Sequence, residues 1–384
     1  MTAVSKANAL FRANQIRTEM GGGGNTAQRV GSLLVDMVDS TMFTPAVTAD
    51  PVTNTAGIQA AIDAAHAAHL GGLPGTVVVL PAGSIPLAAS VLADVLFSAG
   101  AAVAPSTGCL VMRDGVTLRG EGVGRTVLRP AAPALTAVLV RNGSNQTIAD
   151  LEIDGQSVAS LEAGHGILQV LSANDPTIVV AGLLIESVLV RRVGGLGVGV
   201  QNGNLSRALL RNVATFRTGA NGVDVKNRGS AENANGVRLE NIFVDTFGLQ
   251  LPDQAGVDVA GIVTLSGVQV VNAGRAAVVQ HGVRFAAKLP ATAETWGRRS
   301  SLTGFYVRAA SPAFQVSGVQ VKASDVAVSA GTIEACFAGV RITGDPDVVS
   351  GVHVSDVTAH GAGGVGFWVD DSGGSIGTRN TFDS

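Results

Sequence analysis

The chain has 384 residues and a formal net charge of −3, and its 26 basic residues are scattered rather than gathered in a stripe. This pattern excludes nucleic acid as a partner, because phosphate binding needs a concentrated basic surface. Residues 1–20 lack the apolar run of a signal peptide, and no stretch of about 18 uncharged apolar residues marks a membrane span, so we expect synthesis in a cytosol without membrane insertion.

Charged residues make up 14 % of the chain, against about 25 % in an average globular protein, while apolar residues make up 46 % and there are 50 glycines. These charged residues are too few to cover the surface of an elongated monomer. We therefore expect one face of the molecule to pack against copies of itself, most simply as a homotrimer. The alternative is a solenoid whose side chains are merely small.

Residues 1–44 form the first predicted zone. After the glycine run at residues 21–24, the residues Val30, Leu33, Leu34 and Met37 fall at helical spacing, with Thr26 as the expected N-cap. A short amphipathic helix beside a glycine hinge cannot bury its apolar face alone. We expect this segment to dock on another protein or on its trimer mates.

Residues 45–130 form the second zone. An alanine-rich helix is expected at residues 55–66, with Ile58 and Ile62 on one face, followed by strands at residues 76–80 and 115–120. The first coil of a solenoid exposes strand edges and core. A helix lying across that end is therefore expected.

Residues 131–384 form the third zone, in which one phrase recurs. Residues 183–202 align with residues 208–227 without a gap, and short valine-rich strands separated by Gly and Asn continue on both sides. Such units hide their apolar faces only against their neighbours, and they lack the 3.6-residue period of helical repeats. The sequence predicts an all-β fold, a right-handed parallel β-helix.

A resemblance rests on residues 50–62, on the phrases 77–83 (VVVLPAG) and 116–122 (VTLRGEG), and on 151–155 (LEIDG). Together these are similar to the pectate-lyase-like β-helix superfamily over about residues 50–380. That superfamily includes lyases, hydrolases, epimerases and phage tailspikes, so the resemblance implies the fold and leaves the function open. Residues 14–39 resemble the amino-terminal segment of some phage tail fibre and tail-tip proteins, which implies a virion anchor.

A carboxylate pair is the leading candidate for chemistry. In residues 222–226 and 256–260 the valines should point into the core and Asp224 and Asp258 outward. If the two strands are neighbours, the carboxylates lie roughly 5 Å apart, with Lys226 beside the first. That spacing suits the acid and the nucleophile of a retaining glycosidase, and Lys226 could hold an acidic sugar. The alternative is that Asp224 and Asp258 are ordinary residues on the solvent-exposed side of their strands.

The remaining polar positions favour structural roles. Glu152 and Asp154 are expected to point outward as plain coil, and His165 and His281 to be turn residues. Equivalent slots predict amide ladders, one between Asn202 and Asn227 and one between Asn212 and Asn241. Cys109 and Cys336 are interpreted as buried small apolar residues without a disulfide.

An interruption of the repeat at residues 284–308 is interpreted as a basic loop with aromatic residues. It contains Arg284 and Arg308, and it supplies the candidate polysaccharide-binding residues Trp296, Arg298, Arg299 and Tyr306. Loops on a regular scaffold commonly carry recognition. A lateral trimer contact and a solvated loop are the alternatives.

Three functions remain open. The first is a phage tailspike-like protein that attaches to the tail or baseplate through residues 1–44 and contacts bacterial surface polysaccharide. The second is a polysaccharide depolymerase, a hydrolase or lyase acting through Asp224, Asp258 and Lys226. The third is a purely structural virion decoration protein. The 4 % of aromatic residues and the lack of a dense acidic cluster argue against an enzyme, because polysaccharide-degrading β-helices usually need aromatic platforms and often a calcium site. No cofactor and no metal site is expected.

Overall fold

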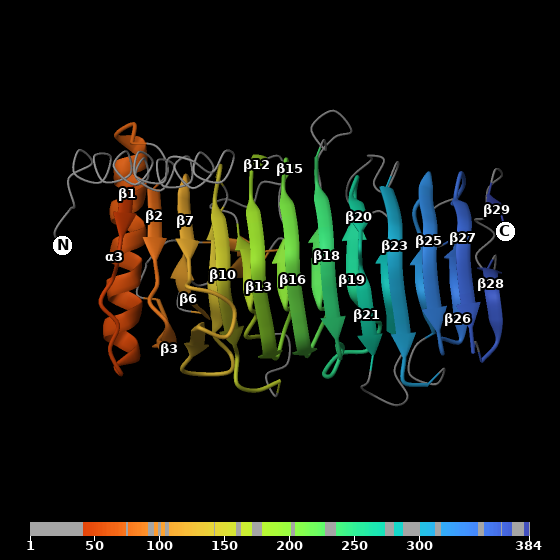
Figure 1. Cartoon of the computed structure of the whole chain (residues 1–384), viewed down its shortest axis with the longest axis horizontal. Coiled ribbons are helices and arrows are strands. Elements are labelled where there is room, and N and C mark those ends of the chain that lie inside the picture. Colours follow the sequence, from red (N-terminus) through yellow and green to blue (C-terminus); the bar gives the residue numbers. More distant parts are fainter. Residues whose placement is uncertain are drawn as a thin grey trace, which may run out of the picture.

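The chain forms an elongated parallel β-helix, seen along its length in Figure 1. The computed structural model describes residues 41–73, 76–90, 96–98, 101–103, 107–141, 143–158, 163–170, 179–200, 204–226, 236–272, 280–286, 300–311, 316–344, 349–361, 363–370 and 380–383. Helix α3 lies at one end of this rod and strands β28 and β29 lie at the other. The recurring valine phrase thus predicted the fold correctly.

The first sheet has fifteen parallel strands. In spatial order its main path is β1 (Thr41–Phe43), β2 (Thr76–Val79), β7 (Val116–Arg119), β10 (Thr147–Asp154), β13 (Leu184–Val193), β16 (Leu209–Thr218), β18 (Arg238–Asp245), β20 (Thr264–Ser266), β23 (Ser300–Ala309), β25 (Val326–Glu334), β27 (His353–His360) and β29 (Thr381–Asp383). Three further strands pair with it: β3 (Gly83–Leu87), β8 (Thr126–Pro130) and β21 (Gln269–Asn272).

The second sheet has ten shorter parallel strands. From the α3 end they are β6 (Gly108–Val111), β9 (Thr136–Arg141), β11 (Ile167–Val170), β14 (Val198–Val200), β17 (Val223–Lys226), β19 (Gln254–Ala260), β22 (Gln280–Phe285), β24 (Ser317–Val321), β26 (Ala338–Thr343) and β28 (Val365–Asp370). Two small pairs lie outside both sheets: β4 (Leu96–Ser98) with β5 (Ala101–Val103), antiparallel, and β12 (Val179–Ala181) with β15 (Asn204–Ser206), parallel.

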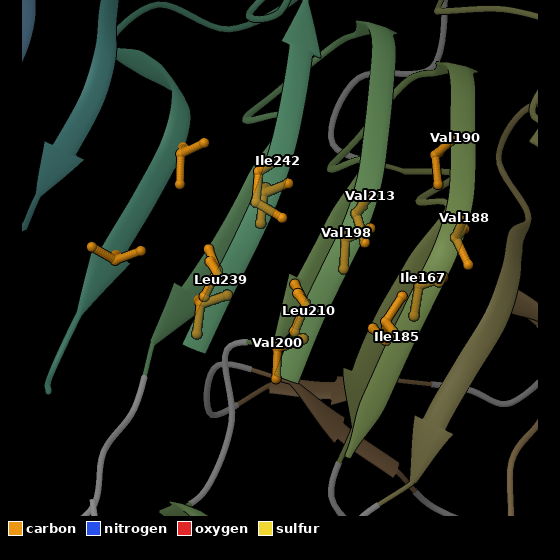
Figure 2. Packing of buried hydrophobic residues seen from close by; sticks show 14 of the residues in the cluster. Ile167, Ile185, Val188, Val190, Val198, Val200, Leu210, Val213, Leu239 and Ile242 are labelled. Atoms are coloured by element: carbon orange, nitrogen blue, oxygen red, sulfur yellow. The ribbon is translucent and has the colours of Figure 1, made fainter. Parts of the chain in front are cut away.

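The core consists of inward-facing side chains stacked in columns. Ile185, Leu210 and Leu239 are register partners on β13, β16 and β18, and they form one such column, visible in Figure 2. From the second sheet, Val198 and Val200 point into the same core and are fully buried. Each fully buried aliphatic side chain contributes about 1.5–3 kcal/mol relative to exposure, so the columns account for the valine-rich phrase.

The corners of the coil explain the polar and glycine positions in that phrase. In the long strands of the first sheet a bend recurs at one residue of left-handed backbone, for example Asn212 (φ 54°) and Asn241 (φ 53°). At the start of the second sheet's strands the coil turns tightly. A Cβ at Gly222 would lie 2.5 Å from Cγ1 of Val244 on the first sheet and 2.7 Å from the carbonyl oxygen of Gly256. Glycine is required there because any side chain would collide.

Helix α3 (Pro51–Leu70) covers the first coil and buries Ile58 and Ile62. It begins one turn earlier than expected. Asp50 is the N-cap, its carboxylate accepting from the backbone N–H of Thr53 at 2.9 Å, and Pro51 occupies the first helical position. The remaining part of the prediction, a helix that caps the solenoid, is confirmed.

Several expectations fall partly or wholly outside the described residues. One of them is the anchor helix with Val30, Leu33, Leu34 and Met37. The boundary between the first and second zones at residue 44 remains a prediction. The expectation of a loop from residue 284 to 308 is wrong at both ends, since Arg284 lies in β22 and residues 300–309 form β23. In the described part of the chain, no helix is both long and apolar enough to cross a membrane.

Candidate functional site on the outer face of the second sheet

Register stacks one outward side chain per coil on the second sheet. Asp224 on β17 pairs directly with Asp258 on β19, and the row continues to Arg284 on β22. Because the flanking valines of each strand are buried in the core, these side chains point away from it. The following residues, called the outer row below, are successive register partners: Gly199, Asp224, Asp258, Arg284, Gln320, Arg341 and Trp368.

The two carboxylates of the outer row share their donors. Lys226 Nζ lies 3.3 Å from Asp224 Oδ1 and 2.7 Å from Asp258 Oδ1. Asn221 Nδ2 donates to Oδ2 of Asp224 at 2.7 Å and to Oδ2 of Asp258 at 3.3 Å. Asn221 is itself fixed, because its Oδ1 accepts from the backbone N–H of Ala255 at 2.7 Å. One cation and one amide therefore hold the pair together.

Arg284 connects this pair to a neighbouring turn. Its Nη2 donates to Oδ2 of Asp258, and its Nη1 lies 3.1 Å from Oδ1 of Asp253. His281 is buried beside it, with Nε2 3.4 Å from the same Asp253 oxygen and Nδ1 2.7 Å from the hydroxyl of Ser317. Burial lowers the pKa of His281, so its imidazole is neutral near pH 7.

Both carboxylates are buried, although they lie outside the coil: Asp224 is 4 % exposed and Asp258 is 2 % exposed. Burial raises the pKa of Asp224, Lys226 opposes this, and the negative charge of Asp258 adds to it. Burial acts on Asp258 in the same sense, but Lys226 and Arg284 outweigh it and lower the pKa to about 2. The pKa values of these two neighbouring carboxyls are therefore shifted in opposite directions, upward for Asp224 and downward for Asp258.

The outer row also gathers buried polar atoms that make no hydrogen bond. Among the described residues, four such side-chain atoms belong to this row or to the outward residues beside it: Arg284 Nε, Gln320 Oε1, Arg341 Nε and Thr343 Oγ1. Asp224 Oδ1, Lys226 Nζ and Asp258 Oδ1 are instead satisfied by the ion pairs described above. Buried polar atoms are normally hydrogen-bonded, so these four atoms have hydrogen-bonding capacity that the described side chains leave unused.

Toward β28 the outer row becomes aromatic. The guanidinium carbon of Arg341 lies 4.3 Å from the ring centroid of Trp368, and Arg341 is paired with Asp370. Phe337 meets the Trp368 ring edge-on, with centroids 6.0 Å apart. Planar polar groups and aromatic rings here share one face.

Toward β6 the same outer face is apolar. Val111, Leu139 and Leu168 are the next register partners beyond Gly199. They belong to a buried apolar cluster that is separate from the core and that also contains Val170, Leu196 and Ala220. Strand β4 contacts β11 on this part of the sheet. The polar part of the outer row therefore begins at Asp224 and extends toward β28.

Part of this site could be predicted from the sequence. The predicted adjacency of Asp224, Asp258 and Lys226 is found, but Asp224 and Asp258 are buried rather than solvated, because Asn221, Lys226 and Arg284 surround them. The larger set was missed: Asn221, Arg284, Gln320, Arg341 and Trp368. A signal for most of it existed, since residues 282–285 (GVRF), 318–321 (GVQV), 339–342 (GVRI) and 366–369 (GFWV) match residues 256–259 (GVDV) and place each of these side chains third.

The second group of candidate residues is not brought together by the described structure. Trp296, Arg298 and Arg299 lie outside the described residues. Tyr306 lies on β23 in the first sheet, where its hydroxyl donates to Glu334 Oε2 at 2.8 Å. Its use in polysaccharide binding remains a prediction.

Glu152 and Asp154 are buried rather than on a wet face. Asp154 accepts from Nε of Arg192 at 2.9 Å and lies 3.3 Å from Arg191, which also reaches Glu152 at 2.7 Å. Burial acts to raise the pKa of Asp154, but the hydrogen bond from Arg192 and the nearby charges outweigh it and lower the pKa. This ion-pair network ties neighbouring coils together.

Of the other structural expectations, the one for His281 is wrong, since this residue is buried within β22 and not in a turn. His165 Nδ1 accepts from the backbone N–H of Leu196 at 2.9 Å, and burial lowers its pKa to about 4. Asn241 Nδ2 donates to Asn212 Oδ1 at 3.2 Å, which confirms that amide ladder, whereas Asn202 and Asn227 lie outside the described residues. Cys109 and Cys336 are buried free thiols. Among the described side chains, no group of three His, Cys, Asp or Glu is arranged to hold a metal ion.

Comparisons with known proteins support the fold. No family model matches the chain. Mannuronan C5-epimerase AlgE6 of Azotobacter vinelandii is 31 % identical over 185 residues, which are 46 % of this chain and 19 % of that protein. The DFA-IIIase of Arthrobacter chlorophenolicus A6 superposes with a TM-score of 0.50 at 16 % identity, covering 89 % of this chain and 94 % of that one.

The tailspike of E. coli bacteriophage HK620, solved as a point mutant in complex with a pentasaccharide, has a TM-score of 0.45 at 13 % identity, covering 88 % of this chain and 66 % of that one. The chain thus spans about a fifth of the length of the curated relative that it matches, and the likeness to solved structures concerns the fold. This protein is a parallel β-helix, and its fold is similar to that of the DFA-IIIase.

Proposed function

We propose that this protein binds polysaccharide along the outer row of the second sheet and does so as a tailspike-like component of a phage virion. The observation that carries the binding proposal is the concentration of buried, non-hydrogen-bonded polar atoms along this row. Sugar hydroxyls both donate and accept hydrogen bonds. A saccharide chain lying along the rod would meet one row residue about every 4.8 Å, the spacing of neighbouring strands.

Sequence similarity supports a carbohydrate ligand. Mannuronan C5-epimerase AlgE6, the 31 % identical relative, is named for a polysaccharide substrate. We propose that the shared coils serve carbohydrate contact here as well. The catalytic activity of that relative is not part of the proposal, because the match spans 19 % of its length.

The test of binding uses the purified chain and bacterial surface polysaccharide in co-sedimentation and calorimetric titrations. We expect saturable binding by the wild type and binding weakened at least tenfold by Gln320→Leu, which removes a row amide at constant size. A matched control is Thr332→Val on the outer face of the first sheet, which should bind like the wild type. Equal binding by the Gln320 and Thr332 variants would remove the outer row from the proposal.

Attachment to the virion is assigned to residues 1–44 and assembly to a homotrimer. Deleting residues 1–40, which keeps strand β1 in place, should leave the β-helix folded and polysaccharide binding intact while abolishing incorporation into particles. Light scattering should give three times the 38.6 kDa of one chain. A truncated protein that still joins particles would contradict the anchor, and a monomer mass would contradict the trimer. Incorporation without any polysaccharide binding would instead favour a decoration protein.

Hydrolysis at the carboxylate pair is a second candidate, favoured by the opposed pKa shifts of Asp224 and Asp258. Asp224 would protonate the glycosidic oxygen, and the Asp258 carboxylate would attack the anomeric carbon before water releases the sugar. The test is the appearance of new reducing ends when polysaccharide is incubated with the protein. Asp224→Asn should abolish them; an unchanged rate would exclude Asp224 as the acid.

A further inference from the structure

The β28 end of the outer row forms a compact group that differs from the carboxylate pair, called the aromatic subsite below. It consists of Gln320 on β24, Arg341 and Thr343 on β26, and Trp368 and Asp370 on β28. Gln320, Arg341 and Trp368 are successive register partners, and Thr343 pairs with Asp370. Five side chains from three adjacent strands therefore share one face.

Three polar atoms of the aromatic subsite make no hydrogen bond although they are buried: Oε1 of Gln320, Oγ1 of Thr343 and Nε of Arg341. Gln320 is 3 % exposed and Thr343 is 8 % exposed, so neither side chain is freely hydrated. A buried acceptor, a hydroxyl and a guanidinium N–H have the hydrogen-bonding capacity that the hydroxyl groups of a sugar ring can satisfy.

The rings of the aromatic subsite supply an apolar surface beside these polar atoms. The Arg341 guanidinium lies over the ring of Trp368, and Phe337, which is 40 % exposed, contacts the same ring at an interplanar angle of 65°. The C–H face of a pyranose is apolar and weakly positive, and an aromatic face carries negative charge density. Rings and polar planes side by side are the usual elements of an orienting ligand site.

The charges of the aromatic subsite indicate whether a charged or an uncharged sugar can bind there. Arg341 is paired with Asp370, and these are the charged members of the aromatic subsite, so it is neutral as a whole. Next along the row, Arg284 is likewise paired with Asp253 and Asp258. A uronate or sulfate placed against Arg341 would compete with Asp370 and repel it. An uncharged sugar meets no such cost.

We propose that the aromatic subsite binds one uncharged sugar unit, a hexose or N-acetylhexosamine, with its C–H face on the aromatic rings and its hydroxyls paired with Gln320 and Thr343. This inference rests on the proposed polysaccharide binding and narrows it to a class of sugar. The polysaccharide then runs along the rod axis, with one unit at β24–β28 and others toward the carboxylate pair.

The chain offers a direct reporter, because it contains only two tryptophans, Trp296 and Trp368. In a Trp296→Phe variant of the full chain, the emission spectrum reports on Trp368 alone. The probes are neutral dextran, galactomannan and laminarin, and acidic alginate and polygalacturonate, with bound polymer measured in parallel by co-sedimentation. We expect a saturable emission change with at least one neutral polymer that persists at about 0.5 M NaCl, since the contact involves no net charge.

Point variants separate the contacts from folding. Trp368→Ala should weaken binding of the responding polymer about tenfold, Trp368→Phe should largely preserve it, and Thr343→Val should weaken it by a similar factor to Trp368→Ala. Circular dichroism confirms that each variant is folded, and the Trp368→Phe protein serves as the check if the alanine variant unfolds.

The outcomes distinguish the two proposals. Polymer that co-sediments without changing Trp368 emission overturns the aromatic subsite while leaving polysaccharide binding intact. A response confined to alginate or polygalacturonate overturns the choice of an uncharged sugar. If no polysaccharide co-sediments, including that of the host surface, the proposed function fails and the subsite fails with it.

Discussion

Asp224 and Asp258 face each other across β17 and β19 and are bridged twice, once by Lys226 Nζ and once by Asn221 Nδ2. Their environments nevertheless differ, because Arg284 reaches only Asp258 among the two. The same local sequence, Val-Asp-Val, thus yields one carboxyl whose pKa is raised and one whose pKa is lowered.

This asymmetry predicts unequal effects of two isosteric substitutions. Asp258→Asn leaves Lys226 and Arg284 without their shared buried counter-charge and should lower the free energy of unfolding by about 3–5 kcal/mol. Asp224→Asn replaces a carboxyl whose pKa is raised by burial, so its negative charge is less stabilised by the fold, and the loss should be below about 1 kcal/mol. Urea unfolding of both variants at pH 7 measures the difference. Equal losses would contradict this asymmetry.

A second prediction concerns pH and His165. Burial lowers the pKa of this imidazole from 6.5 to about 4, so between these values the unfolded chain binds a proton that the folded chain does not. The stabilisation is therefore present above pH 6.5 and is lost as the pH falls toward 4, by about 3 kcal/mol in all.

His165→Gln keeps a side-chain acceptor for the Leu196 N–H but cannot titrate. We expect the difference in unfolding free energy between wild type and this variant to shrink by that amount from pH 7 to pH 4. Since other groups titrate equally in both proteins, their contributions cancel. A difference that stays constant with pH would contradict the buried neutral imidazole.

A third prediction tests the tight corner of the coil. In Gly222→Ala the new methyl group would collide with Val244 and with the backbone of the next coil, and we expect a loss of about 1–3 kcal/mol. Gly366 occupies the same register position on β28, but nothing lies within 4 Å of its added Cβ. Gly366→Ala is therefore the matched control and should leave the thermal unfolding midpoint nearly unchanged.

A fourth prediction uses the bend in the first sheet. Ala330 sits at that bend with φ 53°, although alanine is strained in left-handed backbone. Ala330→Gly should therefore raise the free energy of unfolding by about 1 kcal/mol. At the equivalent position Asn241→Ala should lower it by about 1–2 kcal/mol, because the amide ladder is lost and the same strain is introduced. Changes of the same sign in both variants would refute this account.

The stacked coils and the Asp224–Asp258 contact could be predicted because alternation and in-register stacking convert sequence spacing into distance. The same reasoning failed for Arg284, because the sequence analysis assigns this arginine to a loop, whereas it lies in β22. The phrase Gly282-Val283 marks the true strand. Reading the third position of every such phrase would have given the outer row.

Burial could not be predicted in the same way. Alternation indicates that Asp224 points away from the core, but whether water reaches it depends on Asn221, Lys226 and Arg284, which come from different coils and turns. The opposed pKa shifts follow from those neighbours and not from the strand that carries each carboxyl. The repeat therefore determines which way a side chain points, whereas residues outside the repeat determine its burial and its pKa.

The outer row also implies a simple route of diversification. Each coil contributes one outward-facing residue to this row, and the buried valines on either side of it pack in the same way whichever residue it is. Specificity for a new glycan therefore needs only isolated replacements, and a duplicated winding would lengthen the contact by one step without disturbing the rest. For the proposed polysaccharide binding, this means that the specificity of the rod can change while its scaffold stays the same.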